Sequence, residues 1–126
     1  MPIDYQRDDE RQRLVVRAKG IVALEETLAI MDRQAADGAW SYAVLYDARE
    51  VERGMTAGEV QQMLQHVRTL TATHGPRGPV ALIIGNPEPF NAARRYAMLG
   101  ELSSMDVELF PTVEAAELWL QTVKRA

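Results

Sequence analysis

An aspartate and an arginine directly follow one of the most apolar stretches of the chain. Residues 42–46 are rich in β-branched and aromatic side chains, and this lack of polar alternation is typical of a parallel strand covered on both faces. Asp47 and Arg49 come at its carboxyl end, the edge at which open α/β sheets bind ligands. Asp47 and Arg49 could therefore bind a polar ligand or a protein partner. The alternative interpretation is structural, with Asp47 capping the loop and pairing with an arginine.

A capping box is predicted a few residues later, at Thr56 and Glu59. In this motif the hydroxyl accepts from one backbone N–H of the first helical turn, and the carboxylate accepts from the N–H of the capping residue. Apolar residues at helical spacing follow, among them Val60, Leu64 and Val67, so we expect a helix to begin at Thr56. The cap alone is enough to explain the threonine. The helix N-terminus would also offer N–H groups that favour an acidic or phosphorylated partner.

The candidate binding residues gather where two predicted strands end. Residues 47–56 are expected to form a loop, on which Arg53 adds a second positive charge. Asn86 follows the next apolar strand, residues 80–84, and supplies a donor and an acceptor across the gap. We predict that a partner or ligand contacts the five residues Asp47, Arg49, Arg53, Thr56 and Asn86.

Motifs for catalysis and metal binding are missing from the sequence. It contains no phosphate-binding loop that ends in Gly-Lys-Ser/Thr, no Gly-x-Gly-x-x-Gly and no Gly-x-Ser-x-Gly. There is no cysteine, and His66 and His74 are too far apart for two metal ligands on adjacent helical turns. We therefore predict no catalytic residue, no metal and no cofactor, and we expect the protein not to be an enzyme.

Length and charge restrict the classes to which the protein can belong. Its 126 residues suit one domain, residues 1–126. A net charge of −4 and a pI near 5.2 argue against nucleic-acid binding, which needs a basic face. No apolar run approaches the ~20 residues of a membrane span, and the N-terminus lacks the pattern of a signal peptide. We expect a cytoplasmic protein without membrane insertion, while the oligomeric state stays open.

Hydrophobic periodicity predicts nine elements in the order β-β-α-β-α-β-α-β-α. Two alternating segments form a hairpin, and three further strands alternate with helices, so we expect an α/β fold with a mostly parallel sheet and one antiparallel N-terminal strand. The predicted strands are residues 2–7, 12–19 (ended by Gly20), 42–46, 80–84 and 106–110. The predicted helices begin at Leu24 (ended by Asp37 and Gly38), at Thr56, near residue 91 (covering 91–103) and after Pro111.

This layout resembles the SpoIIAA-like group, which shares its fold with STAS domains of anti-sigma-factor antagonists. The resemblance rests on the hairpin that ends in Gly20, on the strand that ends in Asp47-Ala-Arg49, and on the apolar strand 80–84. It also includes residues 107–110, Val-Glu-Leu-Phe, followed by residues 114–120, Glu-Ala-Ala-Glu-Leu-Trp-Leu.

The resemblance implies a non-enzymatic binding or regulatory module that engages a protein partner or a small ligand through the loop after the central strand. In antagonists, a phosphorylatable serine opens the following helix in an Asp-Ser-Ser-Gly-like run. The matching residues here are 54–58, in which Thr56 is the sole hydroxyl and the Asp-Ser pair is missing. A similar fold in CRAL-TRIO domains keeps an alternative open, namely a lipid or small-molecule carrier, or an enzyme with a pocket at the same edge.

Overall fold

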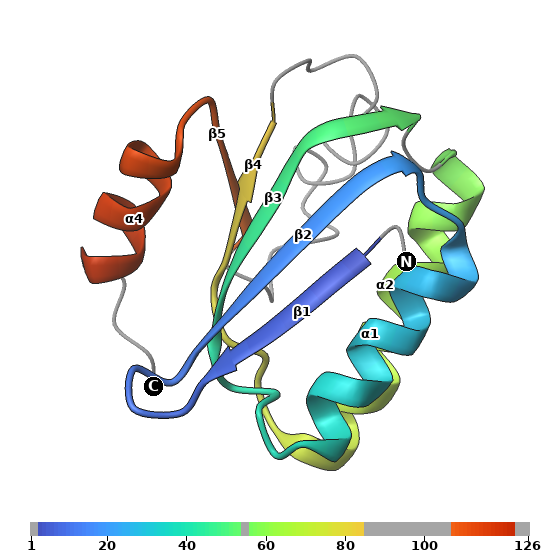
Figure 1. Cartoon of the computed structure of the whole chain (residues 1–126). Helices are drawn as coiled ribbons and strands as arrows, with labels where there is room; N and C mark the ends of the chain where they lie inside the picture. Colours follow the sequence, from blue (N-terminus) through green and yellow to red (C-terminus); the bar gives the residue numbers. More distant parts are fainter. Residues whose placement is uncertain (1–2, 54–55, 85–106, 123–126) are drawn as a thin grey trace.

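Five strands form one sheet in the computed structural model, and they lie in the same order in space as along the chain (Figure 1). The structure describes residues 3–53, 56–84 and 107–122. The strands are β1 (Ile3–Asp8), β2 (Arg13–Ile21), β3 (Ala43–Arg53), β4 (Val80–Ile83) and β5 (Val107–Phe110). β1 runs antiparallel to β2, and the later neighbouring pairs are parallel. The predicted sheet, mostly parallel with one antiparallel N-terminal strand, is confirmed.

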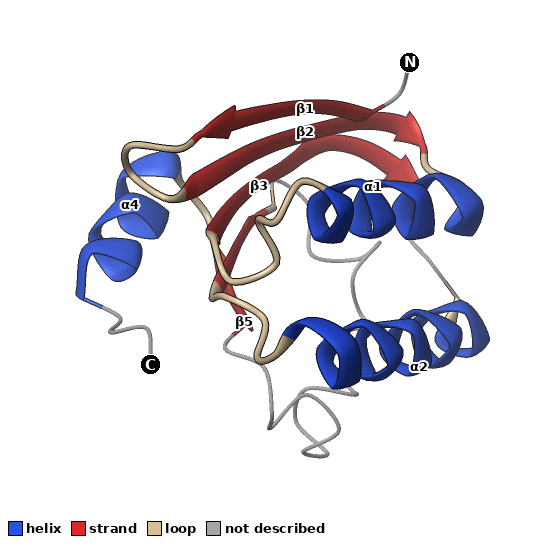
Figure 2. Cartoon of the chain, turned by 90° about the horizontal axis from the view of Figure 1, so that it is seen from below, coloured by secondary structure: helices blue, strands red, loops and turns tan. Residues whose placement is uncertain are grey.

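Helices cover both faces of this sheet (Figure 2). α1 (Leu24–Ala36) and α2 (Ala57–His74) lie side by side on one face, whereas α4 (Val113–Thr122) lies on the other and contacts β3, β4 and β5. α1 and α2 share a face because right-handed crossovers fall on the same side when the strand order advances in one direction. The helix predicted at residues 91–103 lies outside the described residues.

The alternating side chains of the inner strands build a separate core on each face. Val16 of β2 and Val44 of β3 belong to the cluster on the α1–α2 side. Leu45 of β3 and Ile83 of β4 point the other way and pack with Leu120 of α4. β4 lies between β3 and β5 in the sheet. This confirms the prediction that the apolar run at residues 80–84 forms an interior strand.

β3 is longer than the sequence predicts, which is the main correction to the predicted fold. A loop was expected over residues 47–56, but the strand continues to Arg53. The reason is pairing with β2, which itself runs past Gly20, its predicted end, to Ile21. Val51 also packs against the core on the α1–α2 side. The alternation of charged residues around this single valine made the segment look like a loop.

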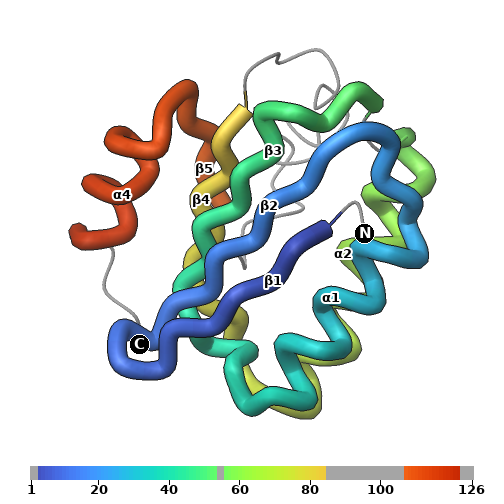
Figure 3. Tube along the Cα trace, in the orientation of Figure 1, coloured from blue at the N-terminus to red at the C-terminus, as the bar shows by residue number. Residues whose placement is uncertain are grey.

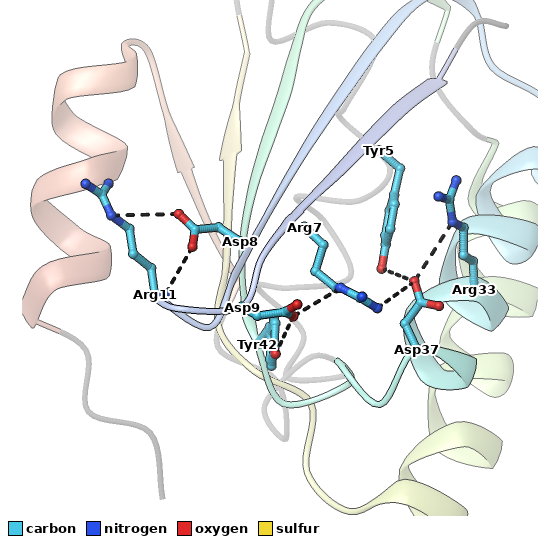
Figure 4. A network of polar contacts seen from close by, with 8 residues as sticks. All are labelled: Tyr5, Arg7, Asp8, Asp9, Arg11, Arg33, Asp37 and Tyr42. Atoms are coloured by element: carbon cyan, nitrogen blue, oxygen red, sulfur yellow. Dashed lines mark hydrogen bonds and ion pairs between the residues drawn. The ribbon is translucent and has the colours of Figure 1, made fainter.

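A network of polar contacts ties the β1–β2 hairpin to the end of α1 (Figure 4). The Tyr5 hydroxyl donates to Oδ2 of Asp37 at 3.0 Å, and this oxygen lies 3.5 Å from Nη1 of Arg7. The Arg33 guanidinium lies over the Tyr5 ring, 4.3 Å from its centroid. Burial, followed by the hydrogen bond to Asp37, raises the pKa of Tyr5 to about 12. The phenol is therefore a neutral donor that fastens the edge strand to the helix.

Replacing Tyr5 by phenylalanine should lower the free energy of unfolding by about 1 kcal/mol near pH 7, because one hydrogen bond to a carboxylate is lost. The folded pKa of Tyr5 lies above its ordinary value of 10.0, so this stability is present below pH 10 and is lost as the pH rises toward 12. Urea unfolding of both proteins at neutral and alkaline pH measures the difference. Equal stability at pH 7 would contradict a stabilising role for this contact.

Candidate functional site

The ends of β2 and β3 form a two-stranded ribbon at the carboxyl edge of the sheet (Figure 3). β4 pairs with β3 only as far as Asp47, which lies opposite Ile83. Beyond this point β3 continues over residues 48–53 and pairs with residues 19–21 of β2, across two irregularities in the register. We call residues 19–21 and 48–53 the carboxyl-edge ribbon. Such bulges are common beside functional sites because they change the direction in which side chains point.

Asp47 is a buried carboxylate that two arginines hold. Its Oδ1 accepts a hydrogen bond from Nε of Arg49 at 2.9 Å, and its Oδ2 accepts one from Nη2 at 2.7 Å. On β2, Nε of Arg17 lies 3.7 Å from Oδ2 of Asp47. The side chain of Asp47 is 12% exposed, whereas those of Arg49 and Arg17 are 45% and 60% exposed. The carboxylate is thus fixed inside, and both guanidinium groups reach the solvent.

The hydrogen bonds from Arg49 hold the pKa of Asp47 below its ordinary value, against the opposing effect of burial, and Arg17 contributes in the same direction. The predicted pairing of Asp47 with an arginine is confirmed, while a role of this pair in binding stays a prediction. Arg17 was not among the predicted residues. It stands at an outward position of the alternating strand 12–19, but its proximity to Asp47 follows from the β2–β3 register, which the sequence does not contain.

Charged side chains of both signs and one large apolar side chain cover the ribbon. Arg53, one of the predicted binding residues, is exposed at the end of β3 and lies opposite Ile21. Ile21 is 62% exposed. Lys19 lies opposite Glu50, and both are exposed. The sequence did not point to Ile21, because the predicted strand, residues 12–19, ended two residues before it.

Thr56 caps α2 as predicted. The backbone N–H of Glu59 donates to Oγ1 of Thr56 at 3.2 Å, and the backbone N–H of Thr56 donates to Oε1 of Glu59 at 2.9 Å. The capping box is therefore confirmed. It also places a carboxylate at the positive end of the helix, which weakens the attraction of this end for an anionic partner.

Replacing Thr56 by alanine should destabilise the protein by roughly 1 kcal/mol, since the first turn of α2 loses its acceptor. Thr56→Ser keeps the oxygen and should leave the denaturation midpoint almost unchanged. Thermal and urea unfolding of the two variants measure this difference. An unchanged midpoint in Thr56→Ala, together with a loss of partner binding, would show that the hydroxyl acts in binding rather than as a cap.

Three further predictions concern Asn86, metal binding and membrane insertion. Asn86 lies outside the described residues. In residues 3–53, 56–84 and 107–122, no group of three or more histidine, aspartate or glutamate side chains is placed to hold a metal ion. Over the same residues, no helix has the length and hydropathy to cross a membrane.

The comparison with known proteins rests on solved structures. No family model and no curated protein matches the chain. An anti-sigma factor antagonist from Mycobacterium paratuberculosis matches with a TM-score of 0.56 and 19% identity, over 94% of each chain. The anti-sigma factor antagonist SpoIIAA in its unphosphorylated form matches with a TM-score of 0.57 and 18% identity, over 96% of this chain and 99% of that one. The chain therefore has the SpoIIAA-like, STAS-type α/β fold that the sequence pattern suggested.

Proposed function

We propose that this chain is a non-enzymatic regulatory module that binds a protein partner through the carboxyl-edge ribbon and the start of α2. The fold supports a regulatory role, since the similar structures are those of anti-sigma factor antagonists. The charged groups at this edge support binding rather than catalysis, because Asp47 and Arg49 are engaged with each other. No specific feature of the described edge favours the carrier or enzyme alternative.

The exposure of Ile21 is the observation that carries this proposal. A large apolar side chain at a projecting edge can serve as the anchor of an interface when a partner covers it and polar residues form the rim around it. Ile21 lies at the end of a bulged ribbon, beside Arg53 and near Lys19. The partner would present an apolar side chain to Ile21 and acidic side chains to the two basic residues.

The chain offers a matched pair of variants for testing this proposal. Leu118, on the outer face of α4, is 64% exposed and Ile21 is 62% exposed, so Ile21→Ser and Leu118→Ser remove similar apolar surface at two different places. Immobilised wild-type protein would first recover a binding partner from the native cell extract, and the affinity of the purified partner would then be measured for both variants.

We expect Ile21→Ser to weaken binding at least about tenfold, the size of an anchor contribution of ~1.4 kcal/mol, and Leu118→Ser to bind like the wild type. The circular dichroism spectra of both variants should match that of the wild type. Undiminished affinity of Ile21→Ser, or a loss confined to Leu118→Ser, would contradict the proposed surface.

A further inference from the structure

The two arginines that hold Asp47 carry more positive charge than this carboxylate neutralises. Arg49 occupies both carboxylate oxygens, with hydrogen bonds of 2.9 and 2.7 Å. Nε of Arg17 lies 3.7 Å from Oδ2, which is an ion-pair distance but too long for a hydrogen bond. Over residues 3–53, 56–84 and 107–122, Asp47 is the one carboxylate that pairs with either guanidinium group. One positive charge of the three side chains therefore has no counterpart at close range.

Strand pairing places both arginines on the same face of the sheet. Arg17 lies directly opposite Asp47 in the β2–β3 register. Asp47 follows Leu45 by two residues, so it shares the face on which Leu45 packs with α4. α4 packs mainly against β3, β4 and β5, and the side chains of Arg17 and Arg49 are 60% and 45% exposed. The two guanidinium groups thus meet the solvent on the α4 side, next to the carboxyl-edge ribbon to which Arg49 belongs.

Both guanidinium groups keep donors that could bind a further oxyanion. The contact with Asp47 uses Nε and one N–H of Nη2 of Arg49, so three N–H groups of this side chain remain. The side chain of Arg17 forms no hydrogen bond within the described residues, and all five of its N–H groups remain. Because both arginines are held by one carboxylate, they lose less side-chain freedom on binding than two unattached arginines would.

We propose that Arg17 and Arg49 form an oxyanion-binding site, which takes a carboxylate or phosphate group on a side chain of the protein partner. This group accepts hydrogen bonds from both arginines, and its charge balances the excess positive charge of the three side chains. Arginine suits both kinds of group because its N–H donors bind them in pairs. The inference rests on the proposed function for its partner, and it adds that an acidic or phosphorylated residue of the partner reaches the α4 side of the sheet.

Short blocked peptides make a direct test possible. A peptide with a central aspartate supplies the carboxylate, one with a central phosphoserine supplies the phosphate, and the same peptide with a central asparagine is the uncharged control. The Nε–H resonances of the arginines are followed in the ¹⁵N-labelled full chain. Arg11 is the matched control within the protein, because it also pairs with an aspartate, Asp8, at 3.8 Å from Nε to Oδ2, but at an exposed turn.

We expect at least one charged peptide to shift the resonances of Arg17 and Arg49 saturably, with one dissociation constant on the order of 1–10 mM, and the asparagine peptide to shift neither. The charged peptide that binds more tightly identifies the preferred group. Arg17→Gln should weaken binding at least about tenfold, as measured at Arg49, and Arg11→Gln should leave it unchanged. The circular dichroism spectrum of Arg17→Gln should match that of the wild type, because the hydrogen bonds between Asp47 and Arg49 remain.

Two results would overturn the inference. One is a set of equal, unsaturated shifts of Arg11, Arg17 and Arg49, which would indicate a general attraction between charges only. The other is undiminished affinity of Arg17→Gln. Ile21→Ser separates this inference from the proposed function, since it should bind the peptides like the wild type. If neither charged peptide binds while Ile21→Ser still loses the protein partner, the oxyanion site is wrong and the proposed function stands.

Discussion

Replacing Gly78 by alanine should destabilise the protein by about 4 kcal/mol, a large share of the roughly 5–15 kcal/mol that is typical of a folded domain. A Cβ atom at this position would overlap the backbone carbonyl oxygens of Ser41 and Tyr42, and backbone atoms cannot move aside as flexible side chains can. Two backbone hydrogen bonds hold residues 78–79 against residues 40–44. The N–H of Gly78 donates to the carbonyl oxygen of Trp40 at 3.1 Å, and the N–H of Val44 donates to the carbonyl oxygen of Pro79 at 2.8 Å. Urea unfolding followed by circular dichroism measures the effect.

Gly58→Ala is the matched control for this prediction. Gly58 lies in the first turn of α2, and an added Cβ would meet nothing closer than Oγ1 of Thr56 at 4.0 Å. Alanine is the better helix former, so this variant should be neutral or more stable by up to about 1 kcal/mol. A Gly78→Ala variant that unfolds at the wild-type urea concentration would show that the two backbone segments are not packed as closely as described.

Asp47→Asn should cost about 2 kcal/mol of stability at pH 7, because Arg49 and Arg17 lose the buried charge that they share. The folded pKa of Asp47 lies below the ordinary value of 3.8, so the ionised carboxylate stabilises the protein above this pH. Its contribution is lost as the pH falls from 3.8 through the lower folded value. The difference in free energy of unfolding between wild type and variant should therefore be largest at neutral pH and disappear in acid.

Glu50→Gln serves as the control for Asp47→Asn, since it removes a neighbouring but exposed carboxylate from the same strand. It should leave the stability within about 0.5 kcal/mol of the wild type at every pH. Urea titrations of the three proteins across this pH range give the comparison. If the difference in free energy of unfolding between wild type and Asp47→Asn stayed constant down to the most acidic pH, the charge of the carboxylate would not be what stabilises the protein.

Local patterns predicted most of the described fold. The apolar run at residues 80–84 indicated an interior strand because strands buried on both faces lose their polar alternation. The spacing of Thr56 and Glu59 indicated the start of α2 because the capping box is a contact between near neighbours in the sequence. The parallel arrangement followed from the alternation of strands and helices, which restricts the possible topologies.

The features that the sequence did not predict depend on contacts between distant segments. β3 continues to Arg53 because β2 supplies a partner strand, and its own residues, mostly charged, do not indicate this. Arg17 reaches Asp47 through the β2–β3 register, and Ile21 is exposed because both strands continue past the end of β4.

We propose above all that a protein partner binds at the carboxyl-edge ribbon and the start of α2. The most direct test is a titration of the ¹⁵N-labelled chain with the purified partner, followed by backbone amide resonances. We predict that the largest shift changes fall on Lys19, Ile21, Arg53 and Thr56. Changes that cluster instead on the outer face of α2, around Gln62 and Gln65, would contradict the claim.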